Sequence, residues 1–291
     1  MNQVKTLGLL SLLAGLLVAI GYAIGGSGGA LVGLLIAAAT NFFSWYSSDK
    51  IALAAYQAQP IAPEQAPELY QMVQGLCDRA GLPMPKLYVV PTSAVNAFAT
   101  GRDPHHAAVA VTQGIVQLLP KDELEAVIAH ELSHIQNRDT LTQAVAATVA
   151  GAISYIAQIL QFGMMFGGGR DREQGGNPIV AIATILLAPL AASVIQMAIS
   201  RTREFEADAG SARITGNPRA LASALQRLEA MAQQRPIPVN PSFEPLLIMN
   251  ALPKQMFSSL FSTHPSTQKR IENLLKIEQQ MLTASNAGSI I

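Results

Sequence analysis

Four apolar stretches interrupt this sequence and restrict it to folds in which long hydrophobic helices are held by a bilayer or by a large core. They cover residues 7–24, 29–46, 141–166 and 179–199. Each reaches or approaches the roughly 20 residues with which a helix spans about 30 Å of hydrocarbon. The sequence therefore predicts about four transmembrane helices, arranged as two hairpins.

Each predicted hairpin has an alternative interpretation. The first stretch has the short charged start and apolar middle of a signal peptide. However, a second stretch follows after a few uncharged residues and ends at Trp45 and Tyr46, where interfacial aromatic side chains belong. This favours a hairpin that stays in the membrane. The later pair contains polar residues such as Gln143, Gln158 and Gln161 as well as Pro189, so its alternative is a buried hairpin of a soluble domain.

The composition narrows the class of protein further. Half of the 291 residues are hydrophobic and only 13% are charged, which is unusual for a soluble domain. The formal net charge is zero and the sequence has no run of lysine and arginine, so we expect no binding to nucleic acid. The single cysteine, Cys77, cannot form an internal disulfide and falls on the apolar side of a helical pattern.

Positive charges flank the predicted spans unevenly. Lys5, Lys50, Arg138, Arg201 and Arg203 all lie on one side of them, whereas the GGSGG turn on the other side carries no charge. The loop between the third and fourth spans holds two arginines beside acidic residues, so the bias is modest. The positive-inside rule then predicts that both termini lie in the cytoplasm.

The spans divide the chain into four parts. Residues 1–48 form an N-terminal transmembrane hairpin, 49–140 the first half of a polar domain, 141–200 a second hairpin and 201–291 the second half. With both termini inside, the two polar halves meet on the same side of the membrane. Their patterns predict helices over 64–80, from Pro120, in SRTREFEADAGSARI up to Gly216, from Asn217 and from Pro265, and short strands in KLYVV, NAFAT and AAVAVTQG.

The motif HELSH, in the predicted helix that starts at Pro120, carries the chemistry. Residues four apart on a helix differ by roughly 40° around its axis, so His130 and His134 share one face. That spacing allows two imidazole nitrogens to bind one zinc ion, with Glu131 in reach of a zinc-bound water. The alternative is a chance pair of structural histidines, but the motif uses two of only five histidines in the chain.

A catalytic zinc needs a third protein ligand, which must come from another segment. A third histidine six residues after the motif is absent, because Thr140 stands there. Glu204 and Asp208 in REFEAD are four apart on a predicted helix, so one carboxylate can bind the metal while the other holds a histidine ring. A solvated acidic face paired with Arg201 and Arg203 explains the same spacing equally well.

Together these segments resemble a known family. HELSH with Asn137 and Asp139 after it, EFEAD just past a membrane hairpin, NAFAT upstream and STHPSTQKRI near the end are similar to the HtpX-type membrane zinc metalloproteases, distant relatives of the CAAX prenyl-protein endoproteases. The resemblance covers nearly the whole chain. It implies an integral membrane α-helical protein with an α+β zincin-like metalloprotease domain. It also implies a general base at Glu131 and one zinc ion per chain, held by three ligands: His130, His134 and Glu204.

The resemblance also suggests residues around the ligands. It implies that Asp208 supports a ligand without binding the metal, and we expect Asn137 and Arg270 in the same shell. His264, just before the helix-opening Pro265, is a candidate donor to the oxyanion, with Arg270 orienting it; an exposed helix N-cap is the alternative for His264.

A substrate strand is expected beside the metal. The resemblance points to the strand edge that contains Asn96, Ala97 and Phe98, where a substrate can add as a further strand. The alternative is an ordinary core strand with Phe98 packed inward, which is compatible with the first interpretation.

The implied activity is cleavage of damaged or misfolded membrane proteins at the cytoplasmic side of a bacterial inner membrane. The expected partners are membrane-protein or unfolded polypeptide substrates and the lipid bilayer, and oligomers are possible. A site-2-type intramembrane protease also uses HExxH, but here the motif lies in a charged segment and that family's later Asp-Gly motif has no counterpart. A membrane scaffold with structural zinc is the other alternative, although such sites usually use four ligands, often cysteines.

Overall fold

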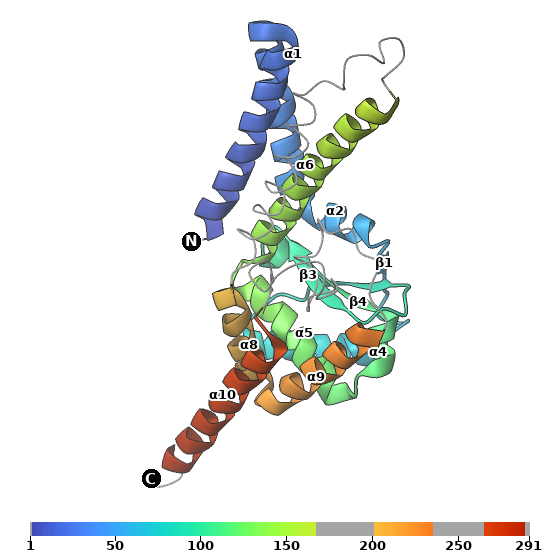
Figure 1. The fold of residues 1–291 in the computed structure, drawn as a ribbon. Coiled ribbons are helices and arrows are strands. Elements are labelled where there is room, and N and C mark those ends of the chain that lie inside the picture. The colour runs from blue at the N-terminus through green and yellow to red at the C-terminus, as the bar shows by residue number, and fades with distance from the viewer. Residues whose placement is uncertain (1, 167–200, 235–264, 289–291) are drawn as a thin grey trace.

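A long helical hairpin and a mixed α+β body make up the computed structural model, which describes residues 2–166, 201–234 and 265–288. The turn of the hairpin lies at the end remote from the body, and the N-terminus and the end of the second arm both lie on the body side (Figure 1). The fold is therefore an α+β domain attached to an apolar helical hairpin.

The hairpin is formed by α1 (Asn2–Tyr46), which is helical except at two glycines. Gly25 and Gly26 have non-helical dihedral angles, with φ of +57° at Gly26, a value that glycine adopts without strain. Close approach of the two arms also depends on glycine. A Cβ at Gly29 would lie 2.0 Å from the carbonyl oxygen of Gly21. Small residues thus allow the arms to pack backbone against backbone, as in transmembrane helix pairs.

Within the described residues, two helical segments are long and apolar enough to cross a membrane. They are Val4–Tyr22 and Gly25–Tyr46, and they match the first two predicted spans. Large apolar side chains on the second arm face outward, including Leu31, Leu35 and Phe42, which are 59–65% exposed. Such a surface is expected where lipid, rather than water, surrounds the helices.

The third predicted span, 141–166, falls within α6 (Thr140–Phe166). This helix packs against the first arm of α1. Leu9 and Leu13 of α1 form a buried cluster with Val145, Val149 and Ile153 of α6. The fourth predicted span, 179–199, lies outside the residues that the structure describes. The predicted count of four spans therefore remains an expectation.

The body consists of a small sheet and several helices. Two elements connect it to the hairpin, α2 (Ser48–Ala55) and the short strand β1 (Gln59–Pro60). The further elements up to the HELSH helix are α3 (Pro67–Ala80), β2 (Lys86–Val90), β3 (Ala97–Gly101), η1 (Pro104–His106), β4 (Ala107–Thr112) and α4 (Gln113–Leu118). The HELSH helix and the helices of the second half are α5 (Lys121–Gln136), α8 (Arg201–Thr215), α9 (Pro218–Gln234) and α10 (Thr267–Gly288).

Most of these elements agree with the sequence patterns. Helices start next to Pro120, at Pro218 and just after Pro265, and the three predicted strands form the sheet together with the unpredicted β1. The strand order is β1-β2-β4-β3, with β2 and β4 parallel and β3 antiparallel to β4. Within the described chain, β3 is thus an edge strand whose outer side pairs with no other strand.

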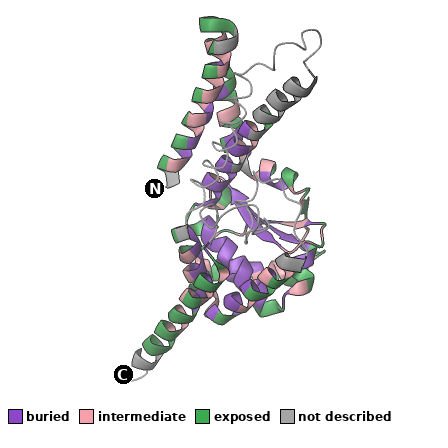
Figure 2. Ribbon diagram, in the orientation of Figure 1, coloured by how far each residue is buried: buried purple, intermediate pink, exposed green. Residues whose placement is uncertain are grey.

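The helix α5 is the buried central helix of the body and packs against both the sheet and the other helices. Asp122 and Glu123 in its first turn interact favourably with the helix dipole, and residues 126–135 are all buried. Figure 2 shows that burial is concentrated around α5 and the sheet, whereas much of α10 is exposed. Because α5 contacts β3 on one side and α8 on another, its side chains can meet groups from both.

Candidate metal centre

Helix α5 presents His130 and His134 to one point. The two rings are nearly perpendicular, and their Nε2 atoms lie 3.2 Å apart. Both residues are at most 4% exposed. The Nε2 atoms therefore face each other in a site largely closed to solvent, as ligands of a shared ion would.

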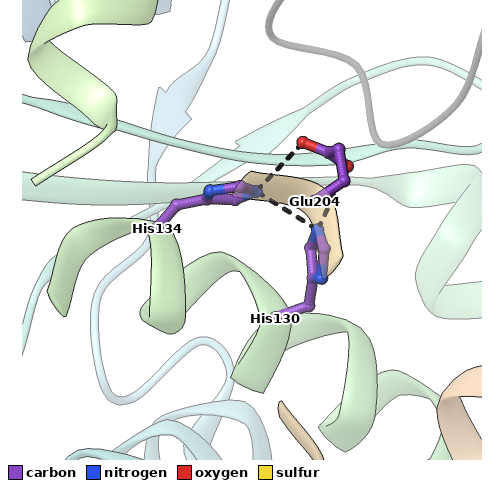
Figure 3. Close-up of side chains that lie close together, drawn as sticks. All are labelled: His130, His134 and Glu204. Atoms are coloured by element: carbon purple, nitrogen blue, oxygen red, sulfur yellow. Dashed lines mark hydrogen bonds and ion pairs between the residues drawn. The ribbon is translucent and has the colours of Figure 1, made fainter. Parts of the chain in front are cut away.

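Helix α8 brings a third donor to the same point. The carboxylate of Glu204 lies 3.6 Å from Nε2 of His134 and 3.8 Å from Nε2 of His130 (Figure 3). This meeting depends on close packing of α8 on α5. A Cβ at Gly210 would lie 2.2 Å from Oγ of Ser133, so only glycine allows the helices to approach so closely there.

The donor set fits a zinc ion. One ligand atom from each of His130, His134 and Glu204 lies within 4.8 Å of the others. Ligands bound at about 2.0–2.1 Å in tetrahedral geometry lie about 3.3 Å apart. The separations between these donors are close to that value, and two imidazoles with one carboxylate are a common set for catalytic zinc.

Asp208 supports the first histidine from one turn further along α8. Its carboxylate lies 3.0 Å from Nδ1 of His130 and is fully buried. Arg270 of α10 donates two hydrogen bonds to it, at 2.6 and 2.9 Å. Although burial opposes ionisation, these contacts hold the pKa of Asp208 below its usual range. The ring of His130 is thereby oriented with Nε2 toward the metal position.

Arg270 lies beside two carboxylates of the centre. Besides Asp208, its guanidinium lies 3.5 Å from Glu204. It thus contacts one proposed ligand and the carboxylate beside another. The proposed partner, His264, lies outside the described residues.

Asp139 performs the supporting role at the second histidine, which sequence reasoning had not assigned. Its Oδ2 lies 3.1 Å from Nδ1 of His134, and Asp139 is 1% exposed. Asn137, which we expected beside the ligands, is instead the exposed C-cap of α5. The difference arises because Arg138 adopts a left-handed conformation, with φ of +57°, and the chain turns back so that Asp139 faces the ring. An aspartate five residues after a ligand histidine was the available sequence signal.

Glu131 lies between the histidines and the sheet. Burial raises its pKa to about 7, and nearby His134 opposes this shift. The backbone N–H of Ala99 in β3 donates to its carboxylate at 2.8 Å. A carboxylate with a pKa near neutrality can both accept and return a proton at physiological pH.

The residues of the predicted substrate strand are all buried, but their backbone groups point to different sides of the strand. Asn96 is bound to Thr112 of β4 through its N–H and carbonyl groups, and Phe98 is 2% exposed with its ring against Tyr56. Since hydrogen-bonded pairs alternate along an antiparallel ladder, Ala97 directs its backbone groups to the outer side. Both Phe98 and Ala97 are buried, and the role of this edge in substrate binding stays a prediction.

A family comparison agrees with this centre. The model for "Peptidase family M48" matches residues 63–278, which include both helices that carry the proposed ligands. Curated relatives match over almost their full lengths. "Protease HtpX homolog" of Nostoc punctiforme is 65% identical over 97% of this chain and 98% of that protein. The protein of the same name from Pyrococcus furiosus is 49% identical over 96% of each.

The fold is also found in a solved structure. The crystal structure of S. mikatae Ste24p superposes with a TM-score of 0.51 at 19% sequence identity. The match covers 94% of this chain and 65% of that one, so this chain spans about two thirds of its length. At this identity the likeness establishes a common fold.

Proposed function

This chain belongs to peptidase family M48 and is a metalloprotease, and on that premise we propose that it is a zinc-dependent membrane endopeptidase that cleaves damaged or misfolded membrane proteins. One zinc ion per chain would be held by His130, His134 and Glu204. The observation that carries the proposal is the convergence of these three buried side chains beside Glu131 and β3, the edge strand of the sheet among the described residues.

Glu131 is the general base and acid in this proposal. When bound, zinc supplies a Lewis acid that lowers the pKa of a water toward 7 and polarises a carbonyl group. Glu131 accepts the proton of the attacking water and then delivers it to the leaving amine. Its elevated pKa suits both steps. His264 remains our candidate for a further donor to the oxyanion.

The substrate is proposed to add as a strand along β3. Ala97 offers outward backbone groups, and the carbonyl oxygen of Gly101 at the other end already accepts a hydrogen bond from Thr140. The N–H of Ala99 is bound to Glu131, which places the proposed base between these positions. Backbone pairing tolerates many side chains, as cleavage of unfolded proteins requires.

We place the active site at the cytoplasmic surface of a bacterial inner membrane. Arg102, next to the end of β3, stacks on Trp45 and Tyr46 at the end of the hairpin and donates to the carbonyl oxygen of Tyr46. These aromatic residues are typical of the membrane interface. The substrate edge would then lie close to the surface where exposed segments of membrane proteins emerge.

Two features count against the alternatives. The HELSH helix belongs to the body rather than to either arm of the hairpin, unlike the intramembrane site of a site-2-type protease. Among the described residues, three side chains rather than four form the donor cluster, which suits a catalytic site with an open position better than a structural one.

A proteolysis assay in detergent tests the proposal. The purified full chain should cleave an unfolded polypeptide such as casein, lose this activity with a zinc chelator and regain it when zinc is added. Purified chain that binds zinc but cleaves neither casein nor a misfolded membrane protein would contradict it.

A further inference from the structure

Arg203 of α8 is a buried cation whose burial needs a physical reason. It is 6% exposed, and none of its three guanidinium nitrogens forms a hydrogen bond within the described part of the chain. Withdrawing a guanidinium from water without hydrogen bonds is costly. A hydrophobic residue of similar size would avoid that cost, so a charge here indicates a role beyond packing.

The nearest acidic partner of Arg203 is the carboxylate that supports a proposed ligand. Nη1 of Arg203 lies 3.7 Å from Oδ1 of Asp139, and the other oxygen of Asp139 lies 3.1 Å from Nδ1 of His134. The backbone N–H of Asp139 also donates to the carbonyl oxygen of His134 at 2.9 Å. Asp139 is therefore held between the ring and the guanidinium, with its two oxygens facing different groups.

The same arrangement occurs at the other histidine. Nδ1 of His130 faces Asp208, and Asp208 is bound by Arg270. Each of the two rings is thus backed first by an aspartate and then by an arginine. In both cases Nε2 is left to face the metal position. The two sets differ in tightness, because Arg270 binds its aspartate through two short hydrogen bonds whereas Arg203 makes a longer ion pair.

The position of Arg203 on α8 places its positive charge beside the carboxylate of Asp139. Arg203 directly precedes Glu204 in the sequence. Helix α8 therefore carries both a proposed metal ligand, Glu204, and the cation that faces Asp139, the carboxylate beside His134. Asp139 is buried, and the guanidinium of Arg203 faces its Oδ1 atom. Held in this position, Oδ2 of Asp139 can accept the Nδ1–H of His134 and keep Nε2 directed at the metal position.

We propose that Arg203 is a positioning residue of the metal centre, which acts through Asp139 to hold the ring of His134 ready for metal binding. This inference rests on the proposed zinc site. Its immediate consequence is that neutralising Arg203 weakens zinc affinity although Arg203 does not touch the metal. Removal of such supporting groups typically lowers metal affinity about 10- to 100-fold.

The experiment measures zinc affinity by competition with a chromophoric chelator, using the full chain purified in detergent. Arg203→Gln should bind zinc about 10- to 100-fold more weakly than the unchanged protein. Arg203→Lys keeps the charge and should restore most of the affinity. The matched control is Arg213→Gln, an exposed arginine on the same helix, which should leave the affinity unchanged.

A double substitution separates positioning from a general structural effect. If Arg203 acts through Asp139, Arg203→Gln should have little further effect on zinc affinity in an Asp139→Asn background. Fully additive losses, unchanged affinity in Arg203→Gln, or no recovery in Arg203→Lys would overturn the inference. Should Arg203→Gln fail to fold, Arg203→Met, which fills the buried space without charge, takes its place in the same comparisons.

The measurement also separates this inference from the proposed function. Unchanged protein that binds no zinc would refute the proposed zinc site itself. If the unchanged protein binds zinc and Arg203→Gln binds it equally tightly, only the role of Arg203 is refuted.

Discussion

Arg270 donates two hydrogen bonds to Asp208, although 62 residues separate them in the sequence and both side chains are buried. The pair connects α10 to the helix that carries Glu204, next to the ring of His130. Breaking a buried ion pair by removing one partner leaves an uncompensated charge, which typically costs about 3–5 kcal/mol.

Arg270→Ala should therefore destabilise the protein even without metal, by about 3–5 kcal/mol. The measurement is thermal or denaturant unfolding in the presence of a chelator, so that lost zinc binding does not contribute. Arg219→Ala, which removes an exposed partner of Glu278, is the control and should change unfolding little. An Arg270→Ala protein as stable as this control would show that the buried pair contributes nothing net.

Glu131→Gln should retain zinc and lose proteolysis. The substitution keeps the size of the side chain but removes its ability to accept a proton, so we expect kcat to fall about 10²- to 10⁴-fold. Zinc content and casein cleavage are measured on the same preparation. Glu125→Gln, on the same helix but outside the centre, should remain active. Full activity of Glu131→Gln would remove Glu131 from the mechanism.

Glu204→Ala should lose stoichiometric zinc, because only two of the three proposed ligands remain. Metal content after dialysis is the measurement. Glu206→Ala provides a control from the same helix, since Glu206 is exposed. One zinc per chain in Glu204→Ala would mean that another residue is the third ligand.

Cys77 should resist thiol reagents in the folded protein. Burial, with a smaller contribution from Asp78, raises the pKa of its thiol to about 11. Because the raised pKa disfavours the reactive thiolate, very little thiolate exists at pH 8. Labelling with a chromogenic disulfide should be slow until denaturant is added, whereas Lys276→Cys, at an exposed site, should react at once. Rapid labelling of Cys77 would contradict its burial.

Gly29→Val should loosen the membrane hairpin. The added Cβ would collide with the backbone of Gly21, so the arms of α1 must separate. The neighbouring Gly28→Val is the control, because a Cβ there meets nothing within 4 Å. Thermal stability in detergent should fall for Gly29→Val alone, and equal stability of the two variants would show that the arms need not pack so closely.

Local patterns predicted much of this protein correctly. The apolar lengths of the first two spans, the helix from Pro120 and the strands of the small sheet are present in the structure. The proximity of His130 and His134 also follows from sequence, because helical geometry alone places residues four apart on one face. Each of these features is encoded within a short segment, so its residues suffice to predict it.

Only the tertiary structure decided which distant groups complete the centre. The spacing within REFEAD did not distinguish a ligand pair from a solvated acidic face. The packing of α8 on α5 places Glu204 beside the Nε2 atoms of both histidines and Asp208 beside Nδ1 of His130. The supporting role of Asp139 and the burial of Arg203 likewise depend on how the two helices pack. A helix repeat fixes which residues share a face, but it does not determine what that face meets; here, shape complementarity between segments some 70 residues apart determines that.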